Sequence, residues 1–529
     1  MNTRRVILLF LLGLFLGSSR AQVIPVEILD NGDGSYTLLR GGEPYYIKGA
    51  GGTNKALFPE LAGRGGNSLR TWGVDGLTRS ILNEADSYGL TVMLGLWMKK
   101  EKDGFDYSNE EKVNEQLENF RYLVRSFKDH PALLAWSIGN EVDLEYTNLG
   151  VWNAVNDIAR MIWEEDGNHP TLTITAGISR SKANAIAERA PDLDMLGVNA
   201  YGSISSLHST ITGSNWEKPY IITEWGVNGP WEVSSTSWGA PLEPNSSEKA
   251  SLFLSRYEQN IDPHKDVCMG SYAFYWNSKF EATQTWFGLF VGKQTTQMID
   301  NLQYAWTGSW NDNLAPRIYT VKINSLGQNQ HVRISQRSGN LITVEASDPD
   351  EDTLHYEYLI LPESGDYLVE TMEGATYRAI PGIITQTDSC TAVMNFGEVH
   401  NNLNLRLYVL VRDGKGHVAT ATFPFQTKFT ANTASPYPEI GYAGGYSISC
   451  KAWPNPFRDV IHILPAGRSA PITVHVLTPL GQIMYSRECE PIDREPVTLD
   501  LSRLPGGVYF LKFSSSDPGF SSFEKLLKE

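Results

Sequence analysis

The feature that most constrains the fold is a regular alternation of two patterns between residues 45 and 305. Short apolar runs alternate with longer stretches in which apolar residues recur every three or four positions, the spacing of a helix face. This order is typical of βα units around a parallel sheet, whose strands are buried on both faces and therefore continuously apolar. Eight strands are predicted: Tyr46–Gly51, Asn67–Trp72, Thr91–Trp97, Leu133–Ile138, Thr171–Thr175, Met195–Asn199, Tyr220–Thr223 and Gly270–Trp276.

The stretches between these strands carry helix signals. Ser108 with Glu111 fits a capping box, and Ser246 or Ser247 is expected to cap a later helix. One face of the helix after Ser108 would carry Val113, Leu117, Phe120, Val124 and Phe127. Eight strands with intervening helices favour a closed (β/α)8 TIM barrel. A doubly wound sheet is the alternative, although no glycine-rich phosphate loop follows any strand.

The chain of 529 residues is too long for one core, and its pattern changes after the barrel. Runs of period two, such as residues 355–360 and 405–411, predict an antiparallel β-sandwich of the Ig-like or cadherin-like kind. The predicted organisation is a signal peptide (1–21), a catalytic barrel (22–312), the β-sandwich (313–429), a linker (430–445) and a small all-β C-terminal domain (446–529). No exposed aromatic platform is evident in the sandwich, which favours a spacer role over glycan binding.

The first 21 residues predict a signal peptide. Arg4 and Arg5 precede an apolar run, Val6–Leu16, that is too short to span a bilayer, and small residues follow at Ser19 and Ala21. An uncleaved anchor helix fits this length less well. We expect export and no transmembrane segment in the mature chain.

Charge and cysteine usage exclude several partners. The net charge of −16 repels phosphate backbones, so we expect no nucleic-acid partner. The four cysteines show no metal-ligand spacing, and whether Cys450 and Cys489 pair is left open. Asp348, Asp350 and Asp352 alternate as in some Ca²⁺ loops, but no complete loop is present and a solvated turn is expected. No metal and no cofactor are predicted.

Two acidic residues follow apolar strands at the positions where barrel enzymes place their chemistry. Glu141 follows the fourth strand and Glu224 follows the seventh, so the two face each other across the mouth. Cleavage of a glycosidic bond needs two flanking carboxyl groups, one to protonate the leaving oxygen and one to attack or to activate water. The alternatives are a solvated Glu141 and a structural salt bridge at Glu224.

The runs that end in Asn140-Glu141 and in Glu224-Trp225-Gly226 resemble the signatures of clan A glycoside hydrolases. The strand-four run looks like family 2 enzymes, while the compact barrel and the following sandwich resemble family 158 and other β-1,3-glucan-active members. The resemblance implies that Glu141 is the general acid/base and Glu224 the nucleophile of a retaining enzyme. Glu141 should then hold a proton near neutral pH, and Glu224 should stay ionised.

The same resemblance assigns supporting roles. Arg70 would pair with the nucleophile, although a buried structural ion pair competes with this role; Tyr201 would donate to the nucleophile, and Asn140 would bind the sugar 2-hydroxyl. Trp276, at the end of the eighth predicted strand, would form the floor under the reacting sugar. Trp72 and Trp97, on or near βα loops, are candidates for further subsites, with core packing as the alternative.

The C-terminal segment resembles the sorting domain of the type IX secretion system. The matching features are Trp453-Pro454-Asn455-Pro456-Phe457, Leu480-Gly481-Gln482, the run 504–512 and the final Lys525-Leu526-Leu527-Lys528. The resemblance implies passage across the inner and outer membranes with the type IX machinery as partner, and a secreted or surface-attached location.

The sequence therefore predicts a secreted retaining β-glycoside hydrolase that acts on a β-linked polysaccharide or oligosaccharide, with endo-β-1,3-glucanase as the preferred activity. β-Mannanase, exo-β-glycosidase and transglycosylase activities are alternatives on the same barrel. A catalytically inactive, secreted glycan-binding or adhesion protein is the alternative from another class. The linkage and the oligomeric state are left open.

Overall fold

A computed structural model describes residues 23–363, 379–385, 389–397, 400–429, 451–453, 457–464, 472–477, 483–489, 497–515 and 521–528. The proposed signal peptide (1–21), the proposed linker (430–445) and Cys450 lie outside the described residues, as does the side chain of Cys489. The chain divides into two compact units, Met1–Ala431 and Asn432–Glu529.

The first unit contains the predicted barrel, which is confirmed. Eight parallel strands close in the order β10-β11-β4-β5-β6-β7-β8-β9. Almost every residue of these strands is buried, as their apolar runs require. The strands are β4 (Ile47–Gly51), β5 (Ser68–Arg70), β6 (Thr91–Leu96), β7 (Leu133–Ile138), β8 (Thr171–Ala176), β9 (Met195–Asn199), β10 (Tyr220–Trp225) and β11 (Cys268–Ala273).

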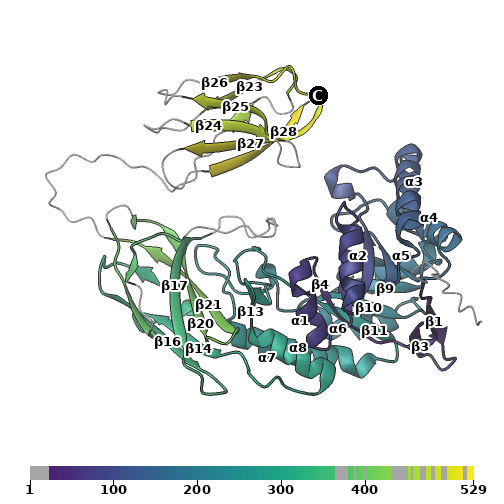
Figure 1. Ribbon diagram of the computed structural model, residues 1–529, viewed down its shortest axis with the longest axis horizontal. Helices are drawn as coiled ribbons and strands as arrows, with labels where there is room; N and C mark the ends of the chain where they lie inside the picture. Colours follow the sequence, from purple (N-terminus) through teal and green to yellow (C-terminus); the bar gives the residue numbers. More distant parts are fainter. Residues whose placement is uncertain are drawn as a thin grey trace, which may run out of the picture. The chain divides into compact units, whose positions relative to one another are not determined.

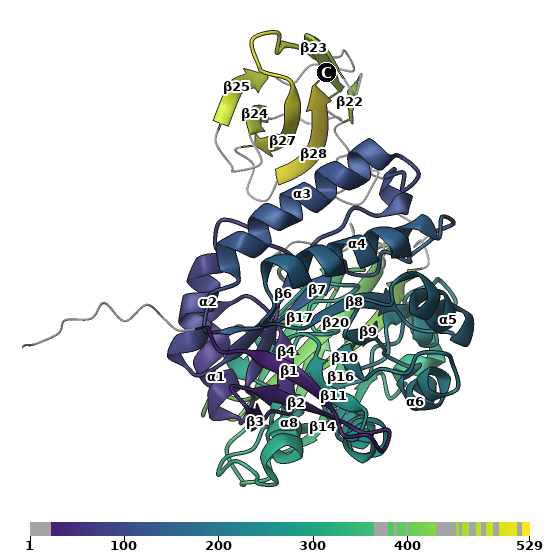
Figure 2. The ribbon, with the colours of Figure 1, turned by 90° about the vertical axis from the view of Figure 1, so that its right-hand side faces the viewer.

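Helices surround this barrel (Figure 2). They are α1 (Phe58–Gly63), α2 (Thr78–Ser87), α3 (Glu110–Phe127), α4 (Gly150–Glu165), α5 (Arg180–Arg189), α6 (Ile204–Thr212), α7 (Ser246–Arg256) and α8 (Gln297–Thr307). Short helical turns also occur at Lys55–Leu57, Glu101–Asp103, Pro230–Glu232, Tyr257–Ile261, Asp262–His264 and Gln328–Gln330.

Two predicted helix caps are wrong by one residue. The side chain of Asn109, not Ser108, accepts from the amide of Lys112 and begins α3. Asn245 caps α7 in a reciprocal capping box with Glu248. Asparagine and serine cap equally well, so neighbouring candidates cannot be ranked by residue type alone.

A small antiparallel sheet closes the amino-terminal end of the barrel (Figure 2). Its strands are β1 (Val26–Asp30), β2 (Tyr36–Arg40) and β3 (Glu43–Pro44). Val26 and Leu38 pack on apolar side chains of the barrel interior, and the amide of Val26 donates to the carbonyl of Asn168 over 2.7 Å. The opposite end, where the parallel strands finish, carries Glu224 at the end of β10 and Glu141 on the loop after β7.

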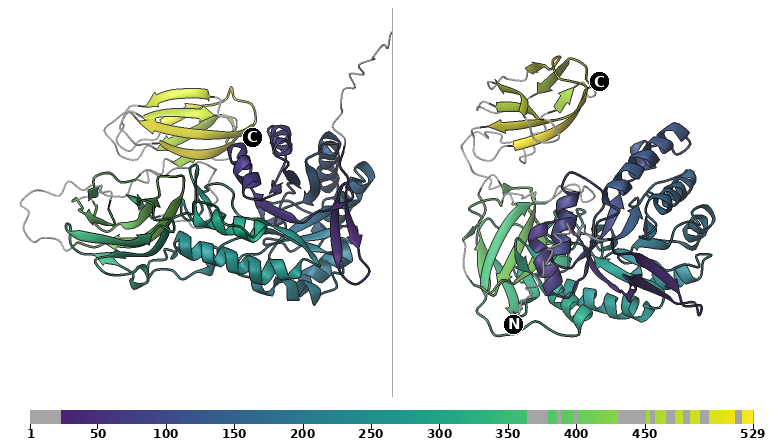
Figure 3. Two further views of the ribbon diagram at one scale, coloured as in Figure 1. Left: turned by 60° about the horizontal axis from the view of Figure 1, so that its bottom comes forward. Right: turned by 45° about the vertical axis from the view of Figure 1, so that its right-hand side comes forward.

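Two sheets with their own apolar core follow the barrel (Figures 1 and 3). One has the order β14-β16-β19-β18 and the other β15-β21-β20-β17. All their pairings are antiparallel except the short β15–β21 pair. The strands are β14 (Arg317–Ile323), β15 (Arg333–Ile334), β16 (Asn340–Ser347), β17 (His355–Pro362), β18 (Ile384–Thr385), β19 (Thr391–Met394), β20 (Asn404–Arg412) and β21 (Val418–Thr427).

Polar groups join this sandwich to the barrel at the start of α7. The hydroxyls of Ser246 and Ser247, expected to be caps, instead accept from the amides of Thr420 and Ile318. Glu243 and Lys249 form a fully buried ion pair, and Thr422 of β21 donates to Glu243 over 2.9 Å. The hairpin β12 (Phe290–Val291) and β13 (Gln294–Thr295) adds an amide-to-carbonyl bond from Thr295 to Gly416. The two domains therefore share a buried polar interface.

The second unit is a small all-β domain with the sheet orders β22-β23-β26 and β25-β24-β27-β28. Its core includes Ile461, Val474, Leu499, Leu511 and Leu526. The strands are β22 (Lys451–Trp453), β23 (Val460–Leu464), β24 (Ile472–Leu477), β25 (Ile483–Cys489), β26 (Val497–Asp500), β27 (Gly507–Ser515) and β28 (Ser521–Lys528).

Candidate active site

The carboxyl ends of the barrel strands bring the two acidic residues to one mouth. Glu224 is the fifth residue of β10, and Glu141 lies three residues beyond the end of β7. The Arg70 guanidinium donates both to Glu224 and to Asn140, the neighbour of Glu141 in the chain, so the two acidic residues lie at the same mouth.

Glu224 accepts three hydrogen bonds from buried or half-buried donors. The Arg70 guanidinium donates to Oε1 over 2.8 Å, and the Trp72 indole donates to the same oxygen over 2.9 Å. The Tyr201 hydroxyl donates to Oε2 over 2.8 Å. Burial raises the pKa of Tyr201 well above its ordinary value, with the charge of Glu224 as the next cause, so this hydroxyl stays a donor. The two oxygens of the Glu224 carboxyl group are thus held by three donors from different parts of the barrel.

Arg70 also connects the two halves of the site. Its guanidinium is fully buried at the end of β5 and donates to Asn140 Oδ1 over 2.6 Å and to the carbonyl of Thr223 over 2.7 Å. Arginine presents several donors in a fixed plane, so one side chain can hold Glu224 and Asn140 in a fixed relation.

Asn199 is a site residue that the sequence did not single out. Its amide donates to Glu141 Oε1 over 2.9 Å and to Asn140 Oδ1 over 3.3 Å, while its own oxygen accepts from Thr223 over 2.8 Å. It is the last residue of β9, two positions before Tyr201. That position at a strand end is the signal that could have identified it.

Glu141 lies in surroundings that favour its neutral form. Burial, and then the charge of Glu224, raise the pKa of its carboxyl from 4.5 to about 7, against smaller lowering effects of Asn199 and Lys100. Its backbone is left-handed (φ 50°), which is uncommon for a residue with a side chain and is found at functional sites. A carboxyl group with a pKa near 7 can both give and take a proton at neutral pH.

The loop after β7 is held from the next βα unit. Asp143 is buried, pairs with Lys182 of α5, and accepts from the amide of Ala176 over 3.0 Å. Lys182 also donates to the carbonyls of Ala176 and Gly177. These contacts hold the backbone of the loop that contains Glu141.

The predicted sugar floor at Trp276 is wrong. Strand β11 ends at Ala273, so Trp276 lies in the following loop, where it is 1% exposed. Its indole donates to the carbonyl of Leu57, and its ring packs against Phe290 and Trp306. It is a core residue.

Phe274 lies beside two partners of Glu224, Trp72 and Tyr201, and the centroid of the neighbouring Tyr275 ring lies 5.8 Å from that of Trp72. The Phe274 ring centroid is 6.1 Å from that of Trp72 and 6.0 Å from that of Tyr201. Trp97 is 48% exposed at the end of β6, and its Cβ adjoins Gly73, the neighbour of Trp72. Trp72 and Trp97 therefore both border the mouth.

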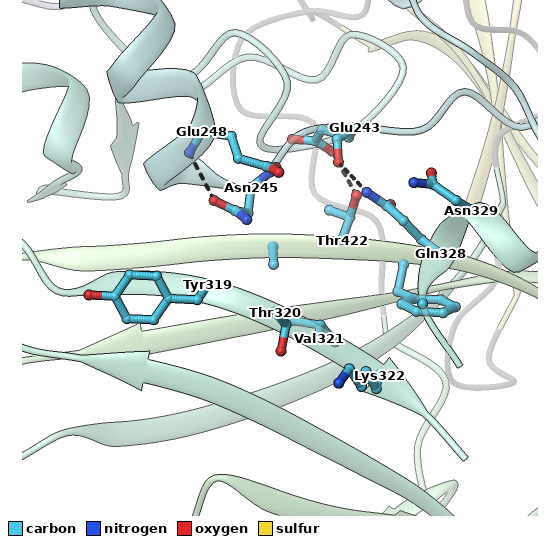
Figure 4. A pocket seen from close by; sticks show the side chains of 13 residues that line it. Glu243, Asn245, Glu248, Tyr319, Thr320, Val321, Lys322, Gln328, Asn329 and Thr422 are labelled. Carbon is cyan, nitrogen blue, oxygen red and sulfur yellow. Dashed lines mark hydrogen bonds between the residues drawn. The ribbon is translucent and has the colours of Figure 1, made fainter. Parts of the chain in front are cut away.

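A cavity of about 230 Å³ lies between the start of α7 and the sandwich (Figure 4). Glu248 and Asn245 are engaged in the helix cap, and Glu243 accepts from Thr422 and Gln328 (Figure 4). No residue proposed for the site from the sequence lines it.

The structure also bears on metals and membranes. Among the described residues, no group of three His, Cys, Asp or Glu side chains is placed to hold a metal ion. Asp348 accepts from the amides of Asp350 and Asp352 in a local turn. No helix in the described ranges combines the length and the apolar character needed to cross a membrane.

Comparisons with known proteins match two parts of the chain. Residues 75–285 match the family described as "Glycosyl hydrolases family 2, TIM barrel domain", and residues 451–529 match the "Secretion system C-terminal sorting domain". No curated protein matches the chain.

Solved structures similar to the chain include three bacterial β-glucuronidases. The enzyme of Parabacteroides merdae is 12% identical (96% of this chain, 64% of that one, TM-score 0.38). That of Dictyoglomus thermophilum is 19% identical (54% and 53%, TM-score 0.43), and that of Bifidobacterium dentium is 18% identical (54% and 49%, TM-score 0.42). The chain thus spans less than two thirds of the length of each.

Both resemblances drawn from the sequence are confirmed by the two family matches. The barrel matches a glycosyl hydrolase domain, and the sorting domain indicates export through the type IX secretion system to the cell surface or beyond it. The barrel of this chain is thus similar to the TIM barrel domain of the family 2 glycosyl hydrolases, and residues 451–529 are similar to a C-terminal sorting domain for secretion.

Proposed function

We propose that the exported chain is a retaining β-glycoside hydrolase in which Glu141 is the general acid/base and Glu224 is the nucleophile. The observation that carries this proposal is the contrast between the two carboxyl groups at one mouth. The Glu141 carboxyl has its pKa raised to about 7, whereas Glu224 accepts from Arg70, Trp72 and Tyr201. Two carboxyl groups in opposite surroundings are the requirement for acid and nucleophile roles.

In the first step, a Glu224 oxygen attacks the anomeric carbon while Glu141 gives its proton to the leaving oxygen. In the second step, Glu141 takes a proton from water, the water oxygen attacks the same carbon, and Glu224 leaves as a carboxylate. The Arg70 guanidinium donates to the side-chain oxygen of Asn140. The amide nitrogen of Asn140 is then left to donate to the sugar 2-hydroxyl.

The proposed substrate is a β-linked polysaccharide or oligosaccharide. Laminarin, a β-1,3-glucan, is the first polymer to test because of the sequence resemblance to β-1,3-glucan-active barrels. β-Mannan substrates, exo action and transfer to a second sugar are the alternatives on the same two carboxyl groups, and chromatography of the products from a polysaccharide panel separates them.

The nucleophile assignment is tested with Glu224→Ala and added azide. We expect loss of hydrolysis by about 10³-fold or more, and azide should restore turnover with a glycosyl azide of inverted configuration. Glu217→Gln, an exposed glutamate just before β10, is the matched control and should keep full activity. Full activity of Glu224→Gln on every substrate cleaved by the wild type would contradict the assignment. Tight laminarin binding without release of reducing ends would favour the adhesion alternative.

A further inference from the structure

A second cavity, of about 320 Å³, opens on the loop after β6. Its lining includes Trp97, Phe105 and three lysines, Lys99, Lys100 and Lys112, against two acidic residues. A local excess of positive charge stands out in a chain whose net charge is −16. Cationic groups beside an exposed aromatic ring, here that of Trp97, favour a ligand with both a flat apolar face and a negative charge.

Lys100 is the unusual member of this group. Only 7% of the residue is exposed, yet among the described residues its ammonium has no hydrogen bond or ion pair. Its one described contact is with the Trp97 ring, whose centroid lies 5.2 Å from Nζ. Lys100 lines the cavity, so an anionic group bound there can pair with this ammonium group.

The loop that carries Lys100 is held firmly. Glu101 accepts from the amides of Thr147 and Asn148 over 2.8 and 2.9 Å, which ties the loop to the segment after Glu141. The amide of Lys99 donates to Gln116 over 2.9 Å. A fixed loop loses little entropy when a ligand binds, so the cavity is prepared for an occupant.

The cavity adjoins the acid/base side of the mouth. Strand β6 pairs with β7, and the amide of Gly139 donates to the carbonyl of Leu96 over 2.8 Å. The charge of Lys100 reaches the Glu141 carboxyl and lowers its pKa. The group that protonates the leaving oxygen faces the leaving sugar, so a subsite next to Glu141 receives that sugar.

We propose that Lys100 and Trp97 form a subsite on the leaving-group side of Glu141 that binds a sugar with a negatively charged substituent. The charged group is a carboxylate, as in a uronic acid, or a sulfate ester. Both groups carry several oxygens that accept hydrogen bonds from an ammonium group. The assignment of the subsite to the leaving-group side rests on the proposed role of Glu141 as the acid. The proposal also makes an unsubstituted β-1,3-glucan a weaker substrate than a glycan with negatively charged sugars.

The test is the binding of free sugars to the full-length protein, measured by ligand-observed NMR titration. The probes are glucuronic acid, glucose 6-sulfate and glucose, which contain no glycosidic bond. We expect at least one charged probe to bind about tenfold or more tightly than glucose. Lys100→Met should abolish this preference and Lys100→Arg should retain most of it. Lys102→Met, an exposed lysine of the same loop that does not line the cavity, should change nothing.

Each outcome decides the proposal. Tighter binding of glucuronic acid or of glucose 6-sulfate than of glucose supports the proposal. It also shows whether the subsite takes a carboxylate or a sulfate. Equal binding of charged and neutral sugars, no binding of either charged sugar, or an unchanged preference in Lys100→Met would overturn the proposal. If Lys100→Met does not fold, the salt dependence of wild-type binding replaces it, since only a charged contact weakens with ionic strength. The binding of free sugars needs no cleavage. If the azide experiment with Glu224→Ala fails, the binding result can therefore still be interpreted.

Discussion

At the residue scale, Glu141 and Glu224 are the same chemical group in two surroundings. Burial raises the pKa of Glu141 and favours its neutral form, while Glu224 accepts hydrogen bonds from Arg70, Trp72 and Tyr201. Arg70 and Asn199 link the two sets of contacts through Asn140. The consequences for stability and for turnover can be tested separately.

Replacing Glu141 with Gln should stabilise the protein at high pH. The folded-state pKa of about 7 lies above the ordinary value of 4.5, so between these values the unfolded chain binds fewer protons and the wild type loses stability as pH rises. The gain of Glu141→Gln should be near zero at pH 4 and reach about 1–3 kcal/mol above pH 7. Urea unfolding across this range measures it. Glu188→Gln, at an exposed position, should show no such trend; a pH-independent gain in Glu141→Gln would contradict the raised pKa.

Activity should decline as pH rises through 7, because the proposed acid must enter the first step protonated. The measurement is kcat/KM as a function of pH on a substrate with a poor leaving group. Glu141→Gln should lose turnover of that substrate at every pH. If kcat/KM instead kept rising well above pH 7, another group would be the acid.

Tyr201→Phe removes one donor from Glu224. We expect kcat/KM to fall by about 10- to 100-fold, because the hydroxyl orients the carboxylate that we propose as nucleophile, with little change in unfolding temperature. Tyr304→Phe, in a half-buried tyrosine stacked on Trp310, is the control and should keep its activity. Equal kinetics for the two variants would remove Tyr201 from the proposed site.

At the element scale, the loop after β7 places Glu141 through backbone conformation. Gly139 has a φ of 74°, and a Cβ there would lie 2.7 Å from Val142 Cγ1. Gly177 also has a positive φ of 59°, but a Cβ there would meet nothing within 4 Å. Alanine substitutions at Gly139 and Gly177 therefore separate the cost of a left-handed backbone from the cost of displacing neighbouring side chains.

Gly177→Ala should cost about 1 kcal/mol, the strain of a left-handed alanine. Gly139→Ala should cost roughly 2–4 kcal/mol and also reduce kcat/KM, because Val142 and Met98 must move and shift the loop of Glu141. Denaturant unfolding and kinetics of both variants check this. Equal costs would show that the contact with Val142 is easily relieved.

The elements also show what the sequence could and could not predict. Glu141 and Glu224 could be proposed from the sequence because the apolar strand that leads to each residue is a local and unambiguous pattern. Trp276 was misplaced because the eighth strand was extended three residues too far, and no local pattern marks its end at Ala273. Asn199 was missed because its partners, Glu141 and Thr223, lie far away in sequence.

At the scale of the whole molecule, the sandwich and the barrel share a buried interface that the sequence did not predict. The sequence could not reveal this interface, because contacts such as Thr422 with Glu243 join residues 179 positions apart and leave no periodic signal. Glu243 and Lys249 are both about 1% exposed at this interface. Removing one partner would leave an unpaired buried charge.

Lys249→Met should therefore destabilise the protein by about 3–5 kcal/mol. The barrel and sandwich, which should unfold together in the wild type, should separate into two transitions in differential scanning calorimetry. Asp262→Asn, which breaks the exposed pair with Lys265, is the control and should shift the transition little. A single unshifted transition in Lys249→Met would show that the ion pair does not couple the domains.

The configuration of the first product tests the proposed mechanism most directly. Proton NMR of the anomeric signals, recorded during the first turnovers on the first β-linked substrate that the protein cleaves, distinguishes the two possible outcomes. A nucleophilic Glu224 predicts that the β-anomer appears first and the α-anomer only later, by mutarotation. Initial appearance of the α-anomer would contradict a covalent intermediate on Glu224 and would assign this carboxylate to the activation of water.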